Sequence, residues 1–236
     1  MVTANANSVW TRLVCRIDFP QPTGLRVLMM PYIQGEPESC PPVVAPYRTI
    51  LQDLYYARGA IGYLTIDESP VKAGVPHRGA RAKYGRAIHT EAGRIAPSIL
   101  EGGGAWGGST GQWGGRPNVL LSGRVGVMVA NNMDDTCAIW DTYHPNTSDD
   151  GDIGDKADQY PYSEAIMVKA GEVHNMGIFT PHESLPAPRD GVRQFIRIVS
   201  SGVSGTELYF TNNPALIPFV QAHRDRVLFH LTDGKL

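Results

Sequence analysis

The sequence predicts an antiparallel all-β fold, a jelly roll or a closed double-stranded β-helix with a few flanking helices, and three observations support this class. Nine or ten short runs alternate apolar and polar residues or are rich in β-branched residues, which is the pattern of half-buried strands. The chain contains 26 glycines and 18 prolines, a content that favours many turns and few long helices. It has neither repeated strand–helix–strand units nor a glycine-rich nucleotide motif, so a parallel sheet covered by helices is not expected.

Extended runs occur along the whole chain, and two segments between them have helical character. A helix is predicted over 47–58, because Pro46 precedes an apolar stripe at helical spacing and Gly59 follows it. A second helix is predicted over about 214–228, because Asn213 and Pro214 suit the N-cap and the first turn. The expected strands are 11–19, 24–33, 61–67, 71–73, 119–130, 136–141, 164–169, 174–179, 192–199 and 207–211.

Length and composition indicate a single domain that spans residues 1–236, because no internal linker interrupts the chain and β-barrels of this length are commonly single domains. Hydrophobic residues make up 42% of the chain, which is enough to form a core. The net charge is −2 with both signs mixed, which argues against a nucleic-acid or anionic-membrane partner. A small-molecule substrate is the expected partner, and assembly into a homo-oligomer is left open.

The cysteines and the N-terminal residues indicate a cytoplasmic protein. Cys15, Cys40 and Cys137 lack metal-ligand spacing and are odd in number, which favours reduced thiols in an intracellular protein. The first residues lack the basic and apolar regions of a signal peptide. No apolar run reaches the length of about 18 residues that a membrane-spanning helix needs, so no membrane partner is expected.

A loop rich in glycine and tryptophan is predicted at about 101–118, in a region with little apolar periodicity. Its centre, Gly102–Gly115, reads GGGAWGGSTGQWGG. Glycine makes the backbone flexible, so this segment is a poor candidate for the core. Two interpretations are left open: a surface loop, or a mobile lid that closes over a bound substrate with Trp106 or Trp113.

Candidate metal ligands occur at two places far apart in the chain. His89 and Glu91 stand two residues apart, and in an extended segment such residues point to the same face. His182 follows Pro181 and is expected on a rigid loop beside a late strand, since proline neither continues a helix nor donates to a sheet. Two histidines and one carboxylate form the ligand set that leaves open positions on non-haem Fe(II).

Two arginines follow in the late strand. Arg193 lies eleven residues after His182, and Arg197 shares its strand face. Arginine is suited to hold a carboxylate, because its guanidinium donates two parallel hydrogen bonds.

This order of a His-x-Glu motif, a late histidine and an arginine about ten residues on resembles that of the cupin-like Fe(II)/2-oxoglutarate-dependent oxygenases. The resemblance covers roughly Tyr84–Val199. It implies a dioxygenase in which Fe(II) is bound by His89, Glu91 and His182. It further implies that the far carboxylate of 2-oxoglutarate pairs with Arg193, a position that Arg197 could take instead. The carboxylate ligand is Glu here, whereas Asp is commoner in these oxygenases.

Other assignments remain open at this point. His174 is an alternative ligand, and Asp141 is an alternative carboxylate that follows Trp140, a candidate substrate-binding residue. His89 and Glu91 also fit a surface ion pair. The same chain fits a non-catalytic jelly roll that binds a ligand or assembles into a larger structure, and a cupin isomerase or dioxygenase that uses no cosubstrate.

Overall fold

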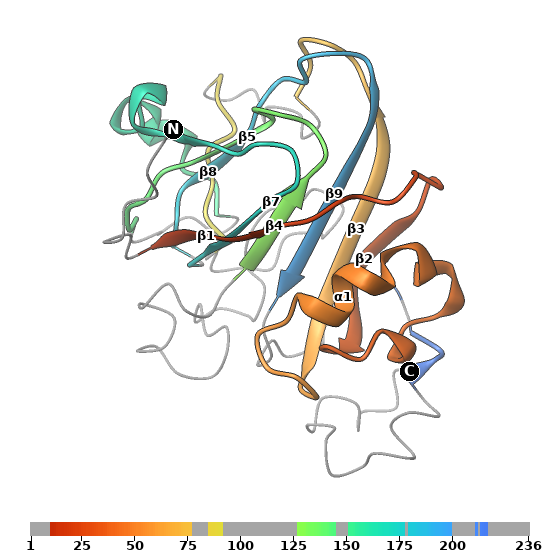
Figure 1. The fold of residues 1–236 in the computed structure, drawn as a ribbon. Coiled ribbons are helices and arrows are strands. Elements are labelled where there is room, and N and C mark those ends of the chain that lie inside the picture. The colour runs from red at the N-terminus through yellow and green to blue at the C-terminus, as the bar shows by residue number, and fades with distance from the viewer. Residues whose placement is uncertain are drawn as a thin grey trace.

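Two β-sheets form the framework of the computed structural model, which describes residues 10–76, 85–91, 127–144, 151–177, 179–199, 211 and 213–216. The strands of the large sheet are β1 (Thr11–Arg16), β2 (Arg26–Ile33), β3 (Ile61–Val71), β4 (Val127–Asn131), β7 (Glu172–Met176) and β9 (Gly191–Val199). Those of the small sheet are β5 (Cys137–Ile139), β6 (Ile166–Met167) and β8 (His182–Ser184). All strand pairs are antiparallel, in the orders β1-β7-β4-β9-β3-β2 and β6-β5-β8 (Figure 1). The predicted antiparallel and predominantly β class is therefore confirmed.

Short helices accompany the sheets in the described part of the chain. Figure 1 shows α1 lying across one face of the large sheet, and apolar residues of α1 belong to the same core cluster as those of β3 and β9. The helical elements are α1 (Arg48–Asp53) and the 3₁₀ helices η1 (Pro37–Ser39), η2 (Pro42–Tyr47), η5 (Gly154–Gln159) and η6 (Tyr162–Glu164).

The long strand β9 lies between β4 and β3 and divides its residues between the two faces of the large sheet. Ile196 and Ile198 belong to the main core cluster under α1. Because successive residues of a strand alternate between faces, Arg193 and Arg197 point to the opposite face. The buried residues of the main cluster are Leu25, Val27, Met30, Tyr32, Cys40, Val44, Tyr47, Ile50, Leu51, Leu54, Leu64, Ile66, Met128, Ala130, Val173, Ile196 and Ile198.

A second apolar cluster covers one face of the small sheet, and it fixes which way β8 presents its residues. Ala138 of this cluster is paired with Glu183, so both point to the clustered face. Ile139 is paired with His182, and both point to the other face. The cluster consists of Ile88, Ala138, Trp140, Ile153, Tyr160 and Leu185.

The segment 85–91 extends the small sheet beyond β8. His89 forms isolated antiparallel bridges to His182 on one side and to Asp152 on the other. The backbone amide of Thr90 donates to the carbonyl of Gly151, and that of Ile153 donates to the carbonyl of Ile88. The segment is thus held between β8 and residues 151–153.

The helix predicted over 47–58 is wrong in its C-terminal half. α1 is only six residues long, and Leu54 after it is extended, with φ −103° and ψ 100°. The backbone amide of Tyr56 donates to Oε1 of Gln34 at 2.9 Å, and the Tyr56 hydroxyl donates to Oδ1 of Asn175 at 2.6 Å. These tertiary contacts override the local periodicity.

Four other predicted segments cannot be compared with the structure over most of their length. The strand predicted over 119–130 is described only from residue 127 on. The glycine- and tryptophan-rich loop at about 101–118 lies outside the described residues. The helix predicted over about 214–228 is described only as far as residue 216, and the strand predicted over 207–211 only at residue 211.

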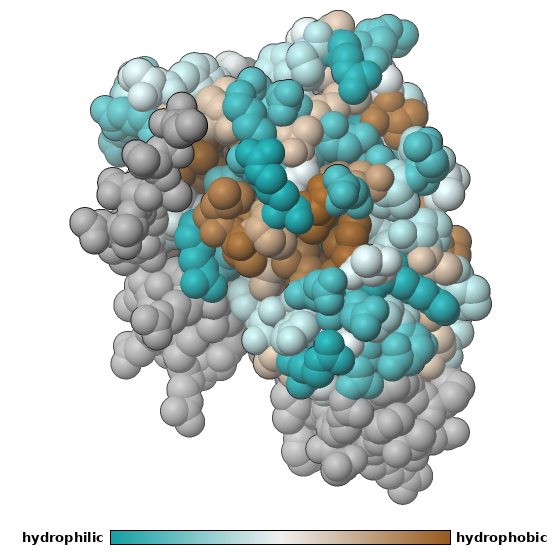
Figure 2. Space-filling model, viewed as in Figure 1, coloured by the Kyte–Doolittle hydropathy of each residue, from teal (hydrophilic) through white to brown (hydrophobic). Residues whose placement is uncertain are grey.

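The surface mixes apolar and polar side chains. Figure 2 shows hydrophobic residues in the middle of the face that Figure 1 turns toward the viewer, with hydrophilic residues around them. Leu13 and Val14 of β1 are among the exposed hydrophobic residues. Among the described residues, no helix has the length and apolar character required to cross a membrane.

Candidate metal centre

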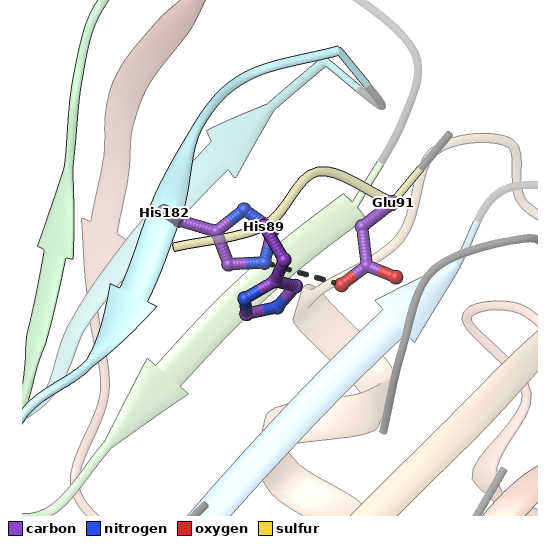
Figure 3. A group of neighbouring side chains, drawn as sticks. All are labelled: His89, Glu91 and His182. Atoms are coloured by element: carbon purple, nitrogen blue, oxygen red, sulfur yellow. Dashed lines mark ion pairs between the residues drawn. The ribbon is translucent and has the colours of Figure 1, made fainter. Parts of the chain in front are cut away.

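His89, Glu91 and His182 converge in the interior of the protein. Each offers a ligand atom, and these atoms all lie within 4.8 Å of one another. The three residues are buried, with 7%, 2% and 6% of their surface exposed. Figure 3 shows both imidazole rings and the carboxylate directed toward a common point. The expectation that a His-x-Glu pair meets a late histidine is therefore confirmed as geometry, and the surface ion pair that these residues also fitted is excluded.

The two histidines are brought together by backbone pairing. The amide of His89 donates to the carbonyl of His182, and the amide of His182 donates to the carbonyl of His89, both at 2.9 Å. Residues that exchange both hydrogen bonds stand directly opposite each other and present their side chains on the same face. The centroids of the two rings are accordingly 4.0 Å apart.

Backbone carbonyls fix the orientation of both rings. Nδ1 of His89 lies 3.0 Å from the carbonyl oxygen of Ala87, and Nδ1 of His182 lies 3.0 Å from that of Thr180. A carbonyl only accepts hydrogen bonds, so Nδ1 of each ring is the protonated nitrogen, and Nε2 is the nitrogen that could bind a metal ion. Metal-binding histidines commonly donate a hydrogen bond from their second ring nitrogen in this way. Nε2 of His182 points to Oε1 of Glu91 at 3.3 Å (Figure 3).

The surroundings of Glu91 keep its carboxylate charged. Burial acts to raise the pKa of Glu91, but Arg197, His182 and His89 together hold it well below its usual range. Nη1 of Arg197 lies 3.5 Å from Oε1 of Glu91. The centre therefore offers one carboxylate oxygen and two imidazole nitrogens, a set that fits a divalent transition-metal ion.

Arg193 lies on the same strand face as Arg197 but has no such partner among the described residues. It is 5% exposed, and neither a salt bridge nor a hydrogen bond connects it to the described part of the chain. Its Nε is a buried atom without a hydrogen-bond partner, and its guanidinium lies 5.3 Å from the ring centroid of Phe195. Burial lowers the pKa of Arg193, although an arginine remains charged in proteins.

Besides Nε of Arg193, Oγ of Ser184 is a buried polar atom without a hydrogen-bond partner near the centre. Ser184 stands two residues after His182 in β8 and therefore points to the same face of the small sheet. Ser184 and Arg193 thus leave polar atoms unsatisfied in the described interior.

His182 differs from its predicted setting on a loop. It is the first residue of β8, a short strand that pairs with β5 on one side and with His89 on the other. Its local sequence, flanked by prolines at 181 and 186, resembles a loop because the strand is only three residues long. Sequence periodicity cannot distinguish so short a strand from a turn.

Among the described residues, the alternative ligands Asp141 and His174 do not lie with His89, Glu91 and His182. Oδ1 of Asp141 accepts the backbone amides of Trp10 and Thr11, at 3.1 and 3.0 Å. His174 lies on β7, where its Nε2 is 3.4 Å from Oε2 of Glu172. Neither belongs to the group of converging ligand atoms.

The predicted substrate-binding tryptophans stay predictions. Trp140 is buried in the apolar cluster of the small sheet, and its indole Nε1 donates to the carbonyl of Pro161 at 2.9 Å. Trp106 and Trp113 lie outside the described residues.

Sequence reasoning missed an ion pair beside the centre. Nη2 of Arg86 lies 2.9 Å from Oε2 of Glu183, on the apolar side of the small sheet. Glu183 adjoins His182, and Arg86 precedes His89 by three residues. The only signal for this contact was the proximity of each residue to a candidate ligand.

Comparisons with protein-family models, with curated proteins and with solved structures find no match to this chain. The functional argument therefore rests on the geometry of the centre.

Proposed function

We propose that the protein is a non-haem Fe(II)-dependent oxygenase whose iron ligands are His89, Glu91 and His182. The observation that supports this most directly is the convergence of three buried ligand atoms within 4.8 Å, with both rings oriented by carbonyls. Two histidines and one carboxylate bind such an ion on one side and keep its other positions open. Iron bound there would supply the one-electron and O₂ chemistry that side chains lack.

The path of the chain between the sheets supports a double-stranded β-helix. Among the described residues from β3 onward, eight segments follow one another along the chain. They lie in turn in the large, small, large, small, small, large, small and large sheet. They are β3, the segment around His89, β4, β5, β6, β7, β8 and β9. The iron ligands come from the second and seventh of these segments. They are far apart in the chain but adjacent in the small sheet, so the winding itself brings the ligands together.

Arg193 supports 2-oxoglutarate as the cosubstrate. Among the described residues, no carboxylate lies within hydrogen-bond distance of Arg193, and its Nε is buried without a partner. A buried cation without an anionic partner is costly, and a guanidinium is shaped to hold a carboxylate. Arg197 is the weaker candidate, because it already lies beside Glu91. In this proposal Arg193 binds the far carboxylate of 2-oxoglutarate. The substrate is a small molecule held nearby, and the burial of the three ligands limits the access of water to the centre.

The test is metal content together with cosubstrate binding. Protein purified without chelators or a histidine tag should contain one iron per chain, and His182→Ala should abolish iron retention. Arg193→Ala should retain iron but bind 2-oxoglutarate about 30-fold or more weakly, as expected when one partner of a buried charge pair is removed. Titration of both ligands into the purified proteins measures these effects.

Each other outcome would change a residue's role or the function assigned to the protein. Loss of iron in Arg193→Ala would show that Arg193 supports the fold and not the cosubstrate. Iron binding without any affinity for 2-oxoglutarate would favour a cupin enzyme that uses no cosubstrate. A wild-type protein that binds no divalent metal would overturn the proposal and favour a non-catalytic jelly roll.

A further inference from the structure

The backbone pairing that aligns His89 with His182 is unusually short. It consists of one bridge with two hydrogen bonds, whereas β9 and β3 are paired over nine residues. A shift of one residue would turn one imidazole to the other face of the sheet. A single bridge supplies little energy against such a shift, so other contacts must hold the register.

Arg86 and Glu183 connect the same two segments on the opposite face of the small sheet. Nε and Nη2 of Arg86 donate to Oε2 of Glu183, at 3.2 and 2.9 Å. The other carboxylate oxygen, Oε1, accepts the backbone amide of Ala87 at 3.1 Å. Glu183 therefore binds both a side chain and the backbone of the segment that carries His89.

Further contacts fix both partners of this pair in place. Nη1 of Arg86 donates to the carbonyls of Ala157 and Tyr160, at 3.1 and 2.9 Å. Its guanidinium lies 4.2 Å from the ring centroid of Tyr162 and 5.4 Å from that of Trp140. The Tyr162 hydroxyl donates to Oε2 of Glu183 at 3.0 Å. Burial, followed by Glu183, raises the pKa of Tyr162, which keeps this hydroxyl a donor.

We propose that Arg86 and Glu183 form a clamp that sets the register between His89 and His182 and thereby positions the two metal-binding rings. The clamp acts one residue from His182 and two to three residues from His89. It holds the strands from the apolar face, so the opposite face remains open for the metal ion and its other ligands. Arg86 and Glu183 are positioning residues, since neither contacts the centre itself. The effect on metal binding rests on the proposed function, whereas the effect on register does not.

Hydrogen exchange in the metal-free protein tests the register. Arg86→Gln and Glu183→Gln should each accelerate exchange of the His89 and His182 amides at least tenfold. Amides in the β3–β9 pairing should keep their wild-type rates. The double variant should lose less protection than the sum of the two single variants, because the two side chains share one ion pair. Arg86→Lys keeps the charge but loses the fork geometry, and should have an intermediate rate.

Binding of Co²⁺ to the same proteins tests the consequence for the centre. We expect the affinity to fall about 10- to 100-fold in the clamp variants, as for other groups that orient metal ligands, together with an altered visible spectrum of the bound ion. Tyr47→Phe is the matched control, since it removes a hydrogen bond to the buried carboxylate of Glu68 on the other side of the large sheet. It should lower the melting temperature without changing either measurement.

The outcomes separate the clamp from the metal proposal. If the wild type binds no Co²⁺, the proposed function fails, and the exchange rates still decide whether the clamp exists. Unchanged exchange at His89 and His182 in both clamp variants would overturn the inference, whatever their melting temperatures. Should the glutamine variants not fold, Tyr162→Phe provides the milder test, because it removes one hydrogen bond to Glu183 and should still accelerate exchange of both amides more than Tyr47→Phe does.

Discussion

At the scale of single residues, two buried arginines on β9 differ in their charge partners. Arg197 lies beside the Glu91 carboxylate and also contacts Oγ1 of Thr65, at 3.4 Å from its Nη2. Arg193 has no anionic partner within hydrogen-bond distance in the described interior. The two arginines therefore differ in the proposed site: Arg197 balances the charge of Glu91, a proposed metal ligand, and Arg193 is proposed to bind an anion that enters.

Arg197 should compete with the metal ion for Glu91. Arg197→Gln leaves the carboxylate buried without its cation, so the metal-free protein should lose about 3–5 kcal/mol of unfolding free energy. A bound metal ion replaces that missing positive charge, so Co²⁺ should raise the melting temperature of Arg197→Gln more than that of the wild type. Thermal unfolding with and without Co²⁺ measures both effects.

Thr65→Val serves as the control for this comparison, because it removes a hydrogen bond of Arg197 and leaves Glu91 in place. Its response to Co²⁺ should equal that of the wild type. An equal loss of stability in Arg197→Gln with and without the metal would show that Arg197 does not act through Glu91.

At the scale of elements, the start of β7 depends on one glycine. Gly171 has a φ of +76°, and a Cβ atom built on it would lie 2.5 Å from the carbonyl oxygen of Ile17. The Gly171 carbonyl accepts the Ile17 amide, and its own amide donates to the carbonyl of Asn131, both at 2.8 Å. Gly171 thus joins the ends of β1 and β4 to the beginning of β7.

Gly171→Ala should destabilise the protein more than Gly24→Ala. Both glycines have positive φ, but no atom lies within 4 Å of a Cβ built on Gly24. Gly24→Ala should therefore lose only the conformational term of about 1–3 kcal/mol, whereas Gly171→Ala adds a clash with backbone that cannot rotate away. Urea unfolding of the two variants measures the difference. Equal losses would mean that the chain around Ile17 shifts without cost.

The elements that the sequence predicts well are those whose pattern is local. The strands at 61–67 and 192–199 were predicted because alternation and β-branched residues identify them, and the structure places β3 and β9 there. The helix over 47–58 was predicted too long, because local periodicity has no information about Gln34. β8 was missed because it is three residues long.

The candidate site was predictable to the same extent. The pair at 89 and 91 follows from strand geometry, and a late histidine with an arginine completes a known ligand pattern. The clamp was not predictable, because Arg86 and Glu183 are far apart in the sequence and come together only when their segments pair in the small sheet. Nothing in their spacing distinguishes them from other charged residues of the chain.

At the scale of the whole molecule, the large sheet has a polar network on the face opposite the metal centre. Glu68 is 4% exposed, and it accepts hydrogen bonds from the amide of Leu25 at 2.7 Å and the hydroxyl of Tyr47 at 2.8 Å. Nε2 of Gln194 donates to it at 3.0 Å, and the amide of Thr23 at 2.6 Å. One carboxylate therefore ties the chain before β2, the helical segment and β9 to β3.

This network should make the stability of the protein sensitive to acid. Burial acts to raise the pKa of Glu68, but the hydrogen bonds from Leu25, Tyr47, Thr23 and Gln194 outweigh it and lower the pKa below its ordinary value of 4.5. A carboxyl group whose pKa is lower in the folded protein stabilises the fold above its unfolded pKa, and that stability is lost as the pH falls through the folded pKa.

Glu68→Gln removes the titrating group. The unfolding free energy of the wild type should therefore exceed that of Glu68→Gln by a constant amount at neutral pH, and the gap should narrow as the pH falls below about 4.5. Urea unfolding at a series of pH values gives both curves, and their difference cancels the contributions of the other acidic residues. Parallel curves down to the acid transition would show that the Glu68 pKa is the same in the folded and unfolded chain, and that its hydrogen bonds contribute nothing specific to the charged form.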